Sequence, residues 1–262
     1  MGDRWAGRTV LITGGAGGMG RAFARLFIES GAAVVLSDIN EPSIGAAVAG
    51  LGQSAPGSVE GLRCDVTEPA DCRGTIERVI KKTGRLDLLI NAAGIWTEGP
   101  TEGTRDDDWD RVIDVNMKGT FLMCRYALPH LERSQGSIVN ISSDAGLIAT
   151  SGVAVYSASK AGVNMLTKAI ALEFAERGVR VNAVCPTDVD TPMIEYQATA
   201  FGKGDPAGYK RALLARYPQR SRARFIKPEE VAALVFFLSS PEAEPITGAC
   251  LSIDFGTTAG LL

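Results

Sequence analysis

The fold of this chain is decided by a stretch near its start, TVLITGGAGGMG at residues 9–20. The apolar run 9–13 predicts a buried strand, and the glycines after it predict a tight turn into a helix. Glycines let the backbone approach a pyrophosphate closely, and the N-terminus of the next helix favours its negative charge. Gly14, Gly18 and Gly20 depart from the best-known Gly-x-Gly-x-x-Gly spacing. The order of strand, turn and helix nevertheless indicates a dinucleotide-binding loop.

A carboxylate ends the second predicted strand, which covers residues 33–38. Asp38 lies about 20 residues beyond the glycines, where an acidic side chain binds a ribose 2′-hydroxyl. The same carboxylate would repel the 2′-phosphate of NADP. No Lys or Arg lies inside the glycine loop or directly after Asp38. The sequence therefore favours NAD as the cofactor.

Strands and helices alternate along the rest of the chain. We expect strands at residues 9–13, 33–38, 59–64, 86–91, 137–141, 179–184 and 249–253, and helices at 18–30, 69–83, 107–133, 155–177 and 228–239. Residues 50–58, rich in Gly, Ser and Pro, are expected to form a surface loop. This alternation predicts a single α/β domain over residues 1–262. Its core would be a doubly wound, Rossmann-like parallel sheet of about seven strands with helices on both faces.

A second group of polar residues lies in the middle of the chain. Tyr156 and Lys160 are one helical turn apart and project from the same helix face. The lysine ammonium favours the phenolate and lowers the tyrosine pKa, which is ordinarily about 10. Ser143 could hold a reacting oxygen by a hydrogen bond. Asn91, Ser143 and Pro186 all follow predicted strands, so they would share the sheet edge at which α/β proteins bind ligands.

With these motifs the chain resembles the short-chain dehydrogenase/reductase family over nearly its whole length. The resemblance rests on the glycine loop, on Asp65-Val66, on NAAG from residue 91, on VNMKG from residue 115, on NISSD and on YSASK. It implies four catalytic residues: Asn116, Ser143, Tyr156 and Lys160. It implies cofactor contacts by Gly14, Gly18, Met19, Gly20, Asp38, Asp65, Val66, Asn91, Ala92, Gly94, Tyr156, Lys160, Pro186, Val189 and Thr191. One position departs, because the family usually has Pro-Gly where this chain has Pro186-Thr187, and the lost glycine restricts the backbone there.

The expected activity is hydride transfer between a secondary alcohol, or the corresponding ketone, and NAD. Tyr156 would be the general base or acid, Ser143 would orient the oxygen, and Asn116 would position a water that carries the proton onward. Two alternatives stay open. The first is an NAD-binding regulator without turnover, although NAD sensing needs no general base. The second is an epimerase or dehydratase that retains NAD, although such relatives usually carry a larger substrate domain.

Residues 186–228 are expected to form a substrate lid, because long insertions near active sites are often lids. The candidate substrate contacts are Ile95, Trp96, Asp144, Leu147, Val153, Met193 and Tyr196. The lid also contains a surplus of arginines, of which Arg216, Arg220 and Arg222 are candidates for binding an anionic group on the substrate. The alternative for these arginines is a solvated basic face or salt bridges to a neighbouring subunit.

Composition limits the partners and the location. The formal net charge of −3 gives no global basic field, so we expect no nucleic-acid partner. The five cysteines show neither a CxxC pair nor a zinc spacing, which leads us to expect reduced thiols, a cytoplasmic location and no catalytic metal. His130 is the only histidine and is not expected to be catalytic. We expect neither a membrane span nor a signal peptide. The family resemblance implies a homo-oligomer, with a tetramer favoured over a dimer.

Overall fold

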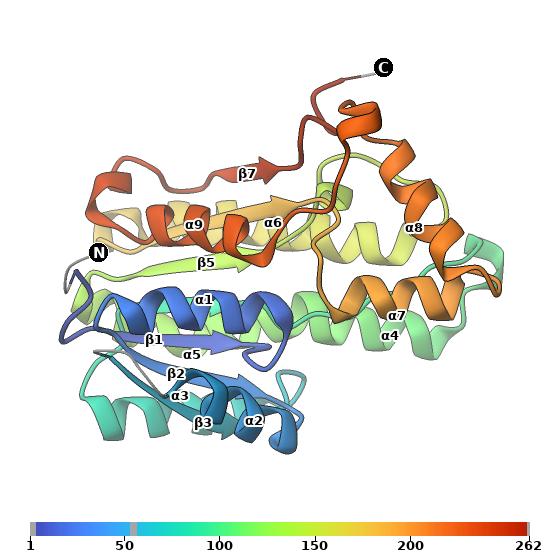
Figure 1. Ribbon diagram of the computed structural model, residues 1–262. Helices are drawn as coiled ribbons and strands as arrows, with labels where there is room; N and C mark the ends of the chain where they lie inside the picture. Colours follow the sequence, from blue (N-terminus) through green and yellow to red (C-terminus); the bar gives the residue numbers. More distant parts are fainter. Residues whose placement is uncertain (1–3, 53–56, 261–262) are drawn as a thin grey trace.

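A single parallel sheet organises the computed structural model, which describes residues 4–52 and 57–260 (Figure 1). Its strands are β1 (Thr9–Thr13), β2 (Ala33–Asp38), β3 (Ser58–Arg63), β4 (Leu88–Asn91), β5 (Ser137–Ile141), β6 (Arg180–Pro186) and β7 (Cys250–Ile253). They pair in the order β3-β2-β1-β4-β5-β6-β7, and every pairing is parallel. The chain therefore reverses its direction of winding between β1 and β4. This order confirms the predicted doubly wound, Rossmann-like α/β fold.

Helices cover both faces of the sheet (Figure 1). One face carries α1 (Gly18–Glu29), α2 (Glu41–Leu51) and α9 (Pro228–Leu238), and the other carries α3 (Pro69–Thr83), α5 (Gly119–Ser134) and α6 (Ala154–Phe174). Successive side chains of a strand point to opposite faces. In β1, Val10 and Ile12 join the core under α1 and α9, while Leu11 joins the core under α3 and α5. Both faces are buried, which explains the uninterrupted apolar runs in the sequence.

Helix α2 is an element that the sequence pattern failed to predict. Asn40 caps it by accepting a hydrogen bond from the Ser43 backbone N–H over 2.9 Å. Only Ile44 and Ala47 of this helix are fully buried, so its apolar periodicity is weak. The predicted surface loop 50–58 is consequently too long. Its first residues end α2, Ser58 begins β3, and residues 53–56 lie outside the described part of the chain.

The expected single helix at 107–133 is interrupted. It consists of α4 (Asp106–Ile113), a π-helical turn (Asp114–Lys118) and α5. The Asn116 side chain bonds to the backbone of Ile95 and to Ser159, and the Asn116 carbonyl accepts a hydrogen bond from the Thr120 hydroxyl over 2.7 Å. These tertiary contacts account for the wider turn, and π-turns of this kind are frequent at functional sites.

Two further helices extend beyond the carboxyl ends of the strands. They are α7 (Pro192–Phe201) and α8 (Pro206–Ala215), drawn in orange at the right of Figure 1. Both belong to the segment 186–228 that was expected to cover the substrate.

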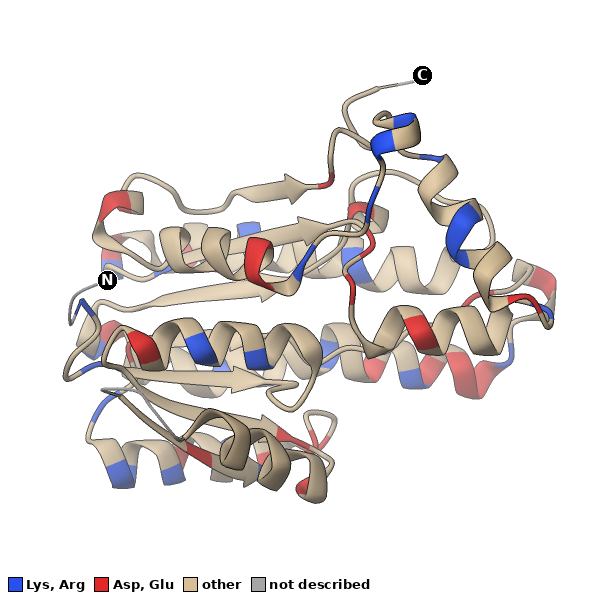
Figure 2. Ribbon diagram, in the orientation of Figure 1, with Lys and Arg blue, Asp and Glu red and all other residues tan. Residues whose placement is uncertain are grey.

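Charged residues lie mainly on helices and connecting loops, with both signs interspersed, while β1, β4 and β5 carry none (Figure 2). Within the described ranges, no helix combines the length and the apolar character that a membrane crossing requires.

Candidate active site

The glycine loop between β1 and α1 leaves no room for side chains. A Cβ atom on Gly20 would lie 2.4 Å from the Gly14 carbonyl oxygen, and one on Gly14 would lie 2.7 Å from the Ala92 carbonyl oxygen. Gly14 also has a φ of +61°, a left-handed conformation that glycine adopts without strain. Helix α1 begins directly after Gly17 and has no side-chain cap. Its first N–H groups are therefore available to an anion such as a pyrophosphate.

Asp38 lies at the carboxyl end of β2, next to the glycine loop. Its carboxylate accepts hydrogen bonds from the backbone N–H groups of Ala16 (3.3 Å) and Asn40 (3.2 Å). These bonds hold the carboxylate beside the loop, where the sequence analysis expected a ribose. Asp65 follows β3 and accepts hydrogen bonds from the backbone and the hydroxyl of Thr67. Its neighbour Val66 is buried under the π-turn, against Gly119.

Asn91, at the carboxyl end of β4, was expected to contact the cofactor, but its side chain forms hydrogen bonds within the protein. Asn91 donates hydrogen bonds to Asn140 Oδ1 (2.8 Å) and to Cys124 Sγ (3.3 Å), and it is buried. These bonds occupy the amide nitrogen of Asn91, whereas its Oδ1 has no hydrogen-bond partner within the described residues. Thr13 shapes the turn after β4, because its hydroxyl accepts hydrogen bonds from the backbone N–H groups of Ala92 and Ala93. The sequence analysis placed Thr13 in the loop motif without giving it this role.

Ser143 and Tyr156 are both buried, with 7% of each residue exposed. Ser143 donates a hydrogen bond to Asp144 Oδ1 (2.9 Å) and accepts one from the Ala145 N–H (3.2 Å). The neighbouring Ser142 instead donates to the Lys160 carbonyl oxygen. Burial raises the pKa of the Tyr156 phenol above its ordinary value, and the nearby Ser143 hydroxyl opposes this rise. The phenol therefore needs a positive charge close by to ionise near neutral pH.

Lys160 provides a cation within the same buried cluster. Its Nζ lies 5.7 Å from the centre of the Tyr156 ring and donates a hydrogen bond to the Ile141 carbonyl oxygen over 2.9 Å. Burial lowers the Lys160 pKa to about 8. Asn116 lies close by, because a Cβ on Gly94 would lie 3.4 Å from Asn116 Oδ1 and 3.5 Å from Lys160 Nζ. The structure thus gathers the four residues expected to be catalytic around the carboxyl ends of β4 and β5.

Comparison with known proteins identifies the family. Residues 14–258 match a family model described as enoyl-(acyl carrier protein) reductase. The chain belongs to the short-chain dehydrogenase/reductase family. A 3-oxoacyl-(acyl-carrier-protein) reductase of Thermotoga maritima is 39% identical and is aligned over 97% of this chain and 98% of its own. A 2,5-dichloro-2,5-cyclohexadiene-1,4-diol dehydrogenase of Sphingobium indicum is 39% identical over 100% of both chains. Among solved structures, levodione reductase matches with a TM-score of 0.94 at 30% identity, covering 98% of this chain and 100% of that chain. This protein is therefore an oxidoreductase of the short-chain type, and its family uses a nicotinamide cofactor.

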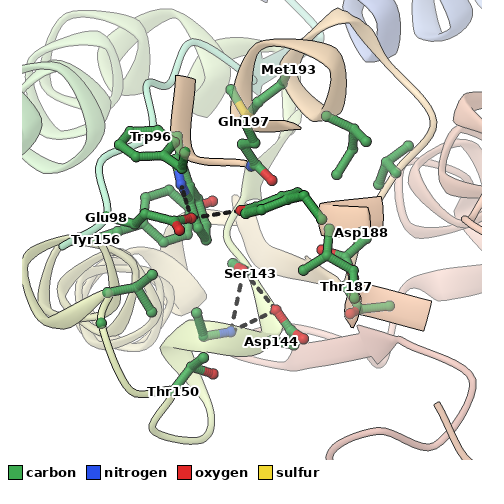
Figure 3. A pocket seen from close by; sticks show the side chains of 18 of the residues that line it. Trp96, Glu98, Ser143, Asp144, Thr150, Tyr156, Thr187, Asp188, Met193 and Gln197 are labelled. Carbon is green, nitrogen blue, oxygen red and sulfur yellow. Dashed lines mark hydrogen bonds between the residues drawn. The ribbon is translucent and has the colours of Figure 1, made fainter. Parts of the chain in front are cut away.

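Two of the four residues expected to be catalytic, Ser143 and Tyr156, open onto a cavity of about 610 Å³ (Figure 3). Ser143 and Tyr156 line one part of it. The expected cofactor contacts Met19, Pro186, Val189 and Thr191 line it as well. These residues expected to contact the cofactor and the pair Ser143 and Tyr156 thus border one continuous space. Trp96, Asp144, Val153 and Met193, which were expected to contact substrate, also line this cavity.

Several expected substrate residues of the short-chain dehydrogenase lie elsewhere. Tyr196 is 49% exposed and packs against Phe201, with ring centres 6.0 Å apart, so it does not line the cavity. Arg220 and Arg222 are exposed on a short turn beyond α8 and do not line it either, nor do Ile95 and Leu147. Their positions do not support the expectation that these side chains contact substrate.

Arg216 is the one candidate arginine that reaches the cavity, and it has a carboxylate beside it. Its guanidinium lies 3.8 Å from Asp188 Oδ2. Tyr217 also donates a hydrogen bond to Asp188 Oδ2 (3.1 Å), while its hydroxyl lies 3.5 Å from the Thr187 hydroxyl. Burial raises the pKa of Asp188 to about 6. The loop where this chain has Thr187 in place of glycine is therefore tied to the lid through Tyr217 and Arg216.

The sequence analysis did not name several residues that line the cavity, among them Glu98, Asp188, Gln197 and Tyr209. These four come from the loop after β4, from the loop after β6 and from helices α7 and α8. No motif marks them, since their proximity arises only from the fold. In the described part of the chain, no group of three His, Cys, Asp or Glu side chains is arranged to hold a metal ion. His130 lies in α5 and does not line the cavity.

Proposed function

We propose that this protein oxidises a secondary alcohol with NAD, or reduces the corresponding ketone with NADH. The observation that carries the proposal is the shared cavity. Buried Ser143 and Tyr156 face the same space as Met19 and Thr191, which belong to the expected cofactor side. A substrate in this space would lie between a general base and a hydride acceptor.

The proposed chemistry assigns one role to each buried polar side chain. NAD, when bound, accepts the hydride that leaves the carbinol carbon. Tyr156 removes the hydroxyl proton, and Ser143 orients the reacting oxygen after exchanging its bond to Asp144 for one to the substrate. Lys160 favours the phenolate, since an ammonium near a phenol lowers its pKa. Asn116 holds the backbone of the loop at Ile95 and positions the proton path beyond Lys160.

The residues present fit a dinucleotide. The side-chain-free loop at Gly14 and Gly20 and the uncapped start of α1 suit a pyrophosphate. Asp38, fixed next to that loop by Ala16 and Asn40, suits a free ribose 2′-hydroxyl and disfavours a 2′-phosphate. We therefore infer NAD as the preferred cofactor.

Tyr156→Phe tests the catalytic assignment. Only the phenol oxygen is lost, and a general base contributes roughly 10²–10⁴-fold to the rate. We expect kcat to fall by that factor with every alcohol that reduces NAD, while NADH binding, followed by fluorescence, stays within about twofold of the wild-type value. Tyr196→Phe is the matched control, because Tyr196 lies outside the cavity. Activity of Tyr156→Phe within threefold of the wild type would remove Tyr156 from the mechanism.

Segment 186–228 is proposed to act as the substrate lid. Helices α7 and α8 supply Met193, Gln197 and Tyr209 to the cavity, and they project beyond the sheet (Figure 1). Lid closure excludes water from the reaction and completes the site. Limited proteolysis within 202–205, between the two helices, should slow when NADH and a substrate ketone are added together.

We also propose that the protein assembles as a homo-oligomer, with a tetramer favoured over a dimer. Helices α4, α5 and α6 carry large apolar side chains that are exposed in the single chain, among them Trp109 (47%), Phe121 (43%), Met165 (64%) and Leu172 (82%). Exposed apolar surface of this extent is typical of an interaction face. Light scattering at micromolar concentration should give a multiple of the 27.6 kDa chain mass, and a monomer would contradict the proposal.

We propose a cytoplasmic location because the cysteines form no disulfide bonds in the described part of the chain. Cys64, Cys72, Cys124, Cys185 and Cys250 are all free, and four of them are buried. Unpaired cysteines are usual in a reducing compartment.

A further inference from the structure

The α7 side of the cavity contains an amide oxygen without a hydrogen-bond partner in the described part of the chain. Gln197 is only 4% exposed and lines the cavity, and its Oε1 has no hydrogen-bond partner within the described residues. Figure 3 shows the Gln197 amide directed into the cavity from the side opposite Ser143. Because a buried polar group without a partner is costly, it is expected to be satisfied by water or by a ligand. The Gln197 amide and Ser143 therefore line the same cavity from different sides.

Glu98 provides a fixed carboxylate in the same cavity. Its Oε2 accepts hydrogen bonds from the Trp96 indole N–H (3.1 Å) and from the Tyr209 hydroxyl (2.6 Å). All the hydrogen bonds found for this carboxylate in the described residues end on Oε2, so Oε1 keeps its capacity to accept. Two donors from different segments hold the group in place, which makes it a preorganised acceptor for a ligand.

Asp144 adds a third acceptor beside the reacting end of the cavity. Its Oδ1 accepts the Ser143 hydroxyl (2.9 Å) and the Ala145 N–H (2.8 Å), and Oδ2 takes no part in those bonds. The lining therefore offers acceptors at Gln197, Glu98 and Asp144, while the hydroxyls of Thr150, Ser151 and Thr187, which can also donate, line the same cavity. A ligand that complements this lining must both donate and accept hydrogen bonds.

The charges around the cavity disfavour an anionic ligand. Three carboxylates line it, from Glu98, Asp144 and Asp188, against two cations, from Lys203 and Arg216. Arg216 already lies beside Asp188. A carboxylate or sulfonate on the substrate would be repelled by the remaining carboxylates in a partly desolvated space. The expectation of an anionic substrate, based on arginine content, is thus not favoured by the geometry.

A hydroxyl group satisfies this lining better than an ammonium does. A hydroxyl both donates and accepts, so it can serve carboxylate oxygens and either end of the Gln197 amide, whereas an ammonium only donates. Apolar side chains of Val153, Met193 and Leu213 also line the cavity and suit a compact carbon skeleton. We propose that the substrate is a neutral diol or polyol whose second hydroxyl is bound by Gln197 and Glu98. This inference rests on the proposed function, because it places the reacting hydroxyl at Tyr156.

Matched substrates test the proposal. Initial rates of NAD reduction are compared for cyclohexanol, its 1,4-diol, the corresponding 4-amino alcohol and the corresponding 4-carboxylate. We expect kcat/KM for the diol to exceed that for cyclohexanol and for both charged analogues by about tenfold or more, because a site built for a hydroxyl rejects analogues that lack it. Equal values for cyclohexanol and the diol, or a preference for a charged analogue, would overturn the proposal.

Two variants, Gln197→Leu and Glu98→Gln, test whether these residues cause the preference for the diol. In Gln197→Leu the ratio of kcat/KM for the diol to kcat/KM for cyclohexanol should fall to within about threefold. Glu98→Gln, which keeps the volume of the side chain, should reduce the advantage in the same direction. Tyr196→Phe, on the same helix as Gln197 but outside the cavity, should leave it unchanged. An undiminished preference for the diol in both cavity variants would refute the role of these residues.

A binding measurement separates this inference from the proposed function. Calorimetric titration of the enzyme–NADH complex with the diol does not require turnover. If no alcohol reduces NAD, the proposed function fails, and the titration still decides the inference. A dissociation constant for the diol that rises about tenfold in Gln197→Leu supports it, and an unchanged constant contradicts it.

Discussion

The Tyr209 hydroxyl donates a 2.6 Å hydrogen bond to Glu98 Oε2 across 111 residues of sequence. It joins helix α8 to the loop that follows β4, and both residues line the cavity. Since the same carboxylate oxygen accepts the Trp96 indole N–H, the lid, the loop and an aromatic wall of the cavity share one acceptor. Trp96 in turn packs on the catalytic candidate Tyr156, with ring centres 4.3 Å apart. The position of α8 and the surroundings of the proposed base are therefore linked.

Tyr209→Phe should weaken substrate binding without affecting the cofactor. The variant removes one hydrogen bond to a carboxylate, and such bonds contribute about 1.5–3 kcal/mol, so KM for the alcohol should rise roughly tenfold. The dissociation constant of NADH should stay unchanged, because Tyr209 lies on the lid and not at the glycine loop. Steady-state kinetics gives KM for the alcohol, and a fluorescence titration gives the dissociation constant of NADH. A rise in both constants would show that the contact instead supports the whole site.

Asp38→Ala should relax the choice between NAD and NADP. Removing the carboxylate takes away a partner for the 2′-hydroxyl and the repulsion of a 2′-phosphate. We expect the ratio of kcat/KM for NAD to that for NADP to fall by at least about tenfold. Glu29→Gln is the charge-matched control, since Glu29 lies at the opposite end of α1. Equal use of both cofactors by the wild type would refute the role assigned to Asp38.

Gly20→Ala should abolish cofactor binding and lower stability. Its Cβ would lie 2.4 Å from the Gly14 carbonyl oxygen and 2.7 Å from Gly15 Cα, and these are backbone atoms that cannot turn aside. Gly74→Ala in α3 is the control, because a Cβ there meets nothing within 4 Å. That control should be neutral or stabilising by up to about 1 kcal/mol. Thermal unfolding with and without NADH measures both effects, and a Gly20→Ala protein that is stabilised by NADH as strongly as the wild type would contradict the prediction.

Asp188→Asn should change how stability depends on pH. Burial raises the Asp188 pKa from its ordinary value of 3.8 to about 6, so between these values the folded protein binds more protons than the unfolded chain. The free energy of unfolding of the wild type should therefore fall as pH rises through this window, by about 1–3 kcal/mol relative to Asp188→Asn. Urea unfolding of both proteins at pH 4 and pH 7, at equal concentration, gives this difference. A difference that does not vary with pH would show that Asp188 ionises normally.

Local spacing was enough to propose the catalytic candidates and the cofactor loop, for a physical reason. Tyr156 and Lys160 share a helix face because they are one turn apart, and the glycines act within a single turn between strand and helix. Both follow from interactions among near neighbours in sequence. By contrast, α2 was missed because few of its residues are buried, and the π-turn at Asn116 was missed because it depends on contacts with Ile95 and Ser159.

The sequence by itself determined the alternation of strands and helices, the family resemblance and the candidates for catalysis and NAD binding, because these depend on short-range periodicity and on motif spacing. Only the tertiary structure decided which lid residues face the cavity. Arg216 reaches it while Arg220 and Arg222 do not, although all three lie in one basic stretch. Glu98 and Gln197, which we propose bind the second hydroxyl of the substrate, line the same cavity although one lies in the loop after β4 and the other in α7. Such packing joins residues about a hundred positions apart, and no local pattern encodes it.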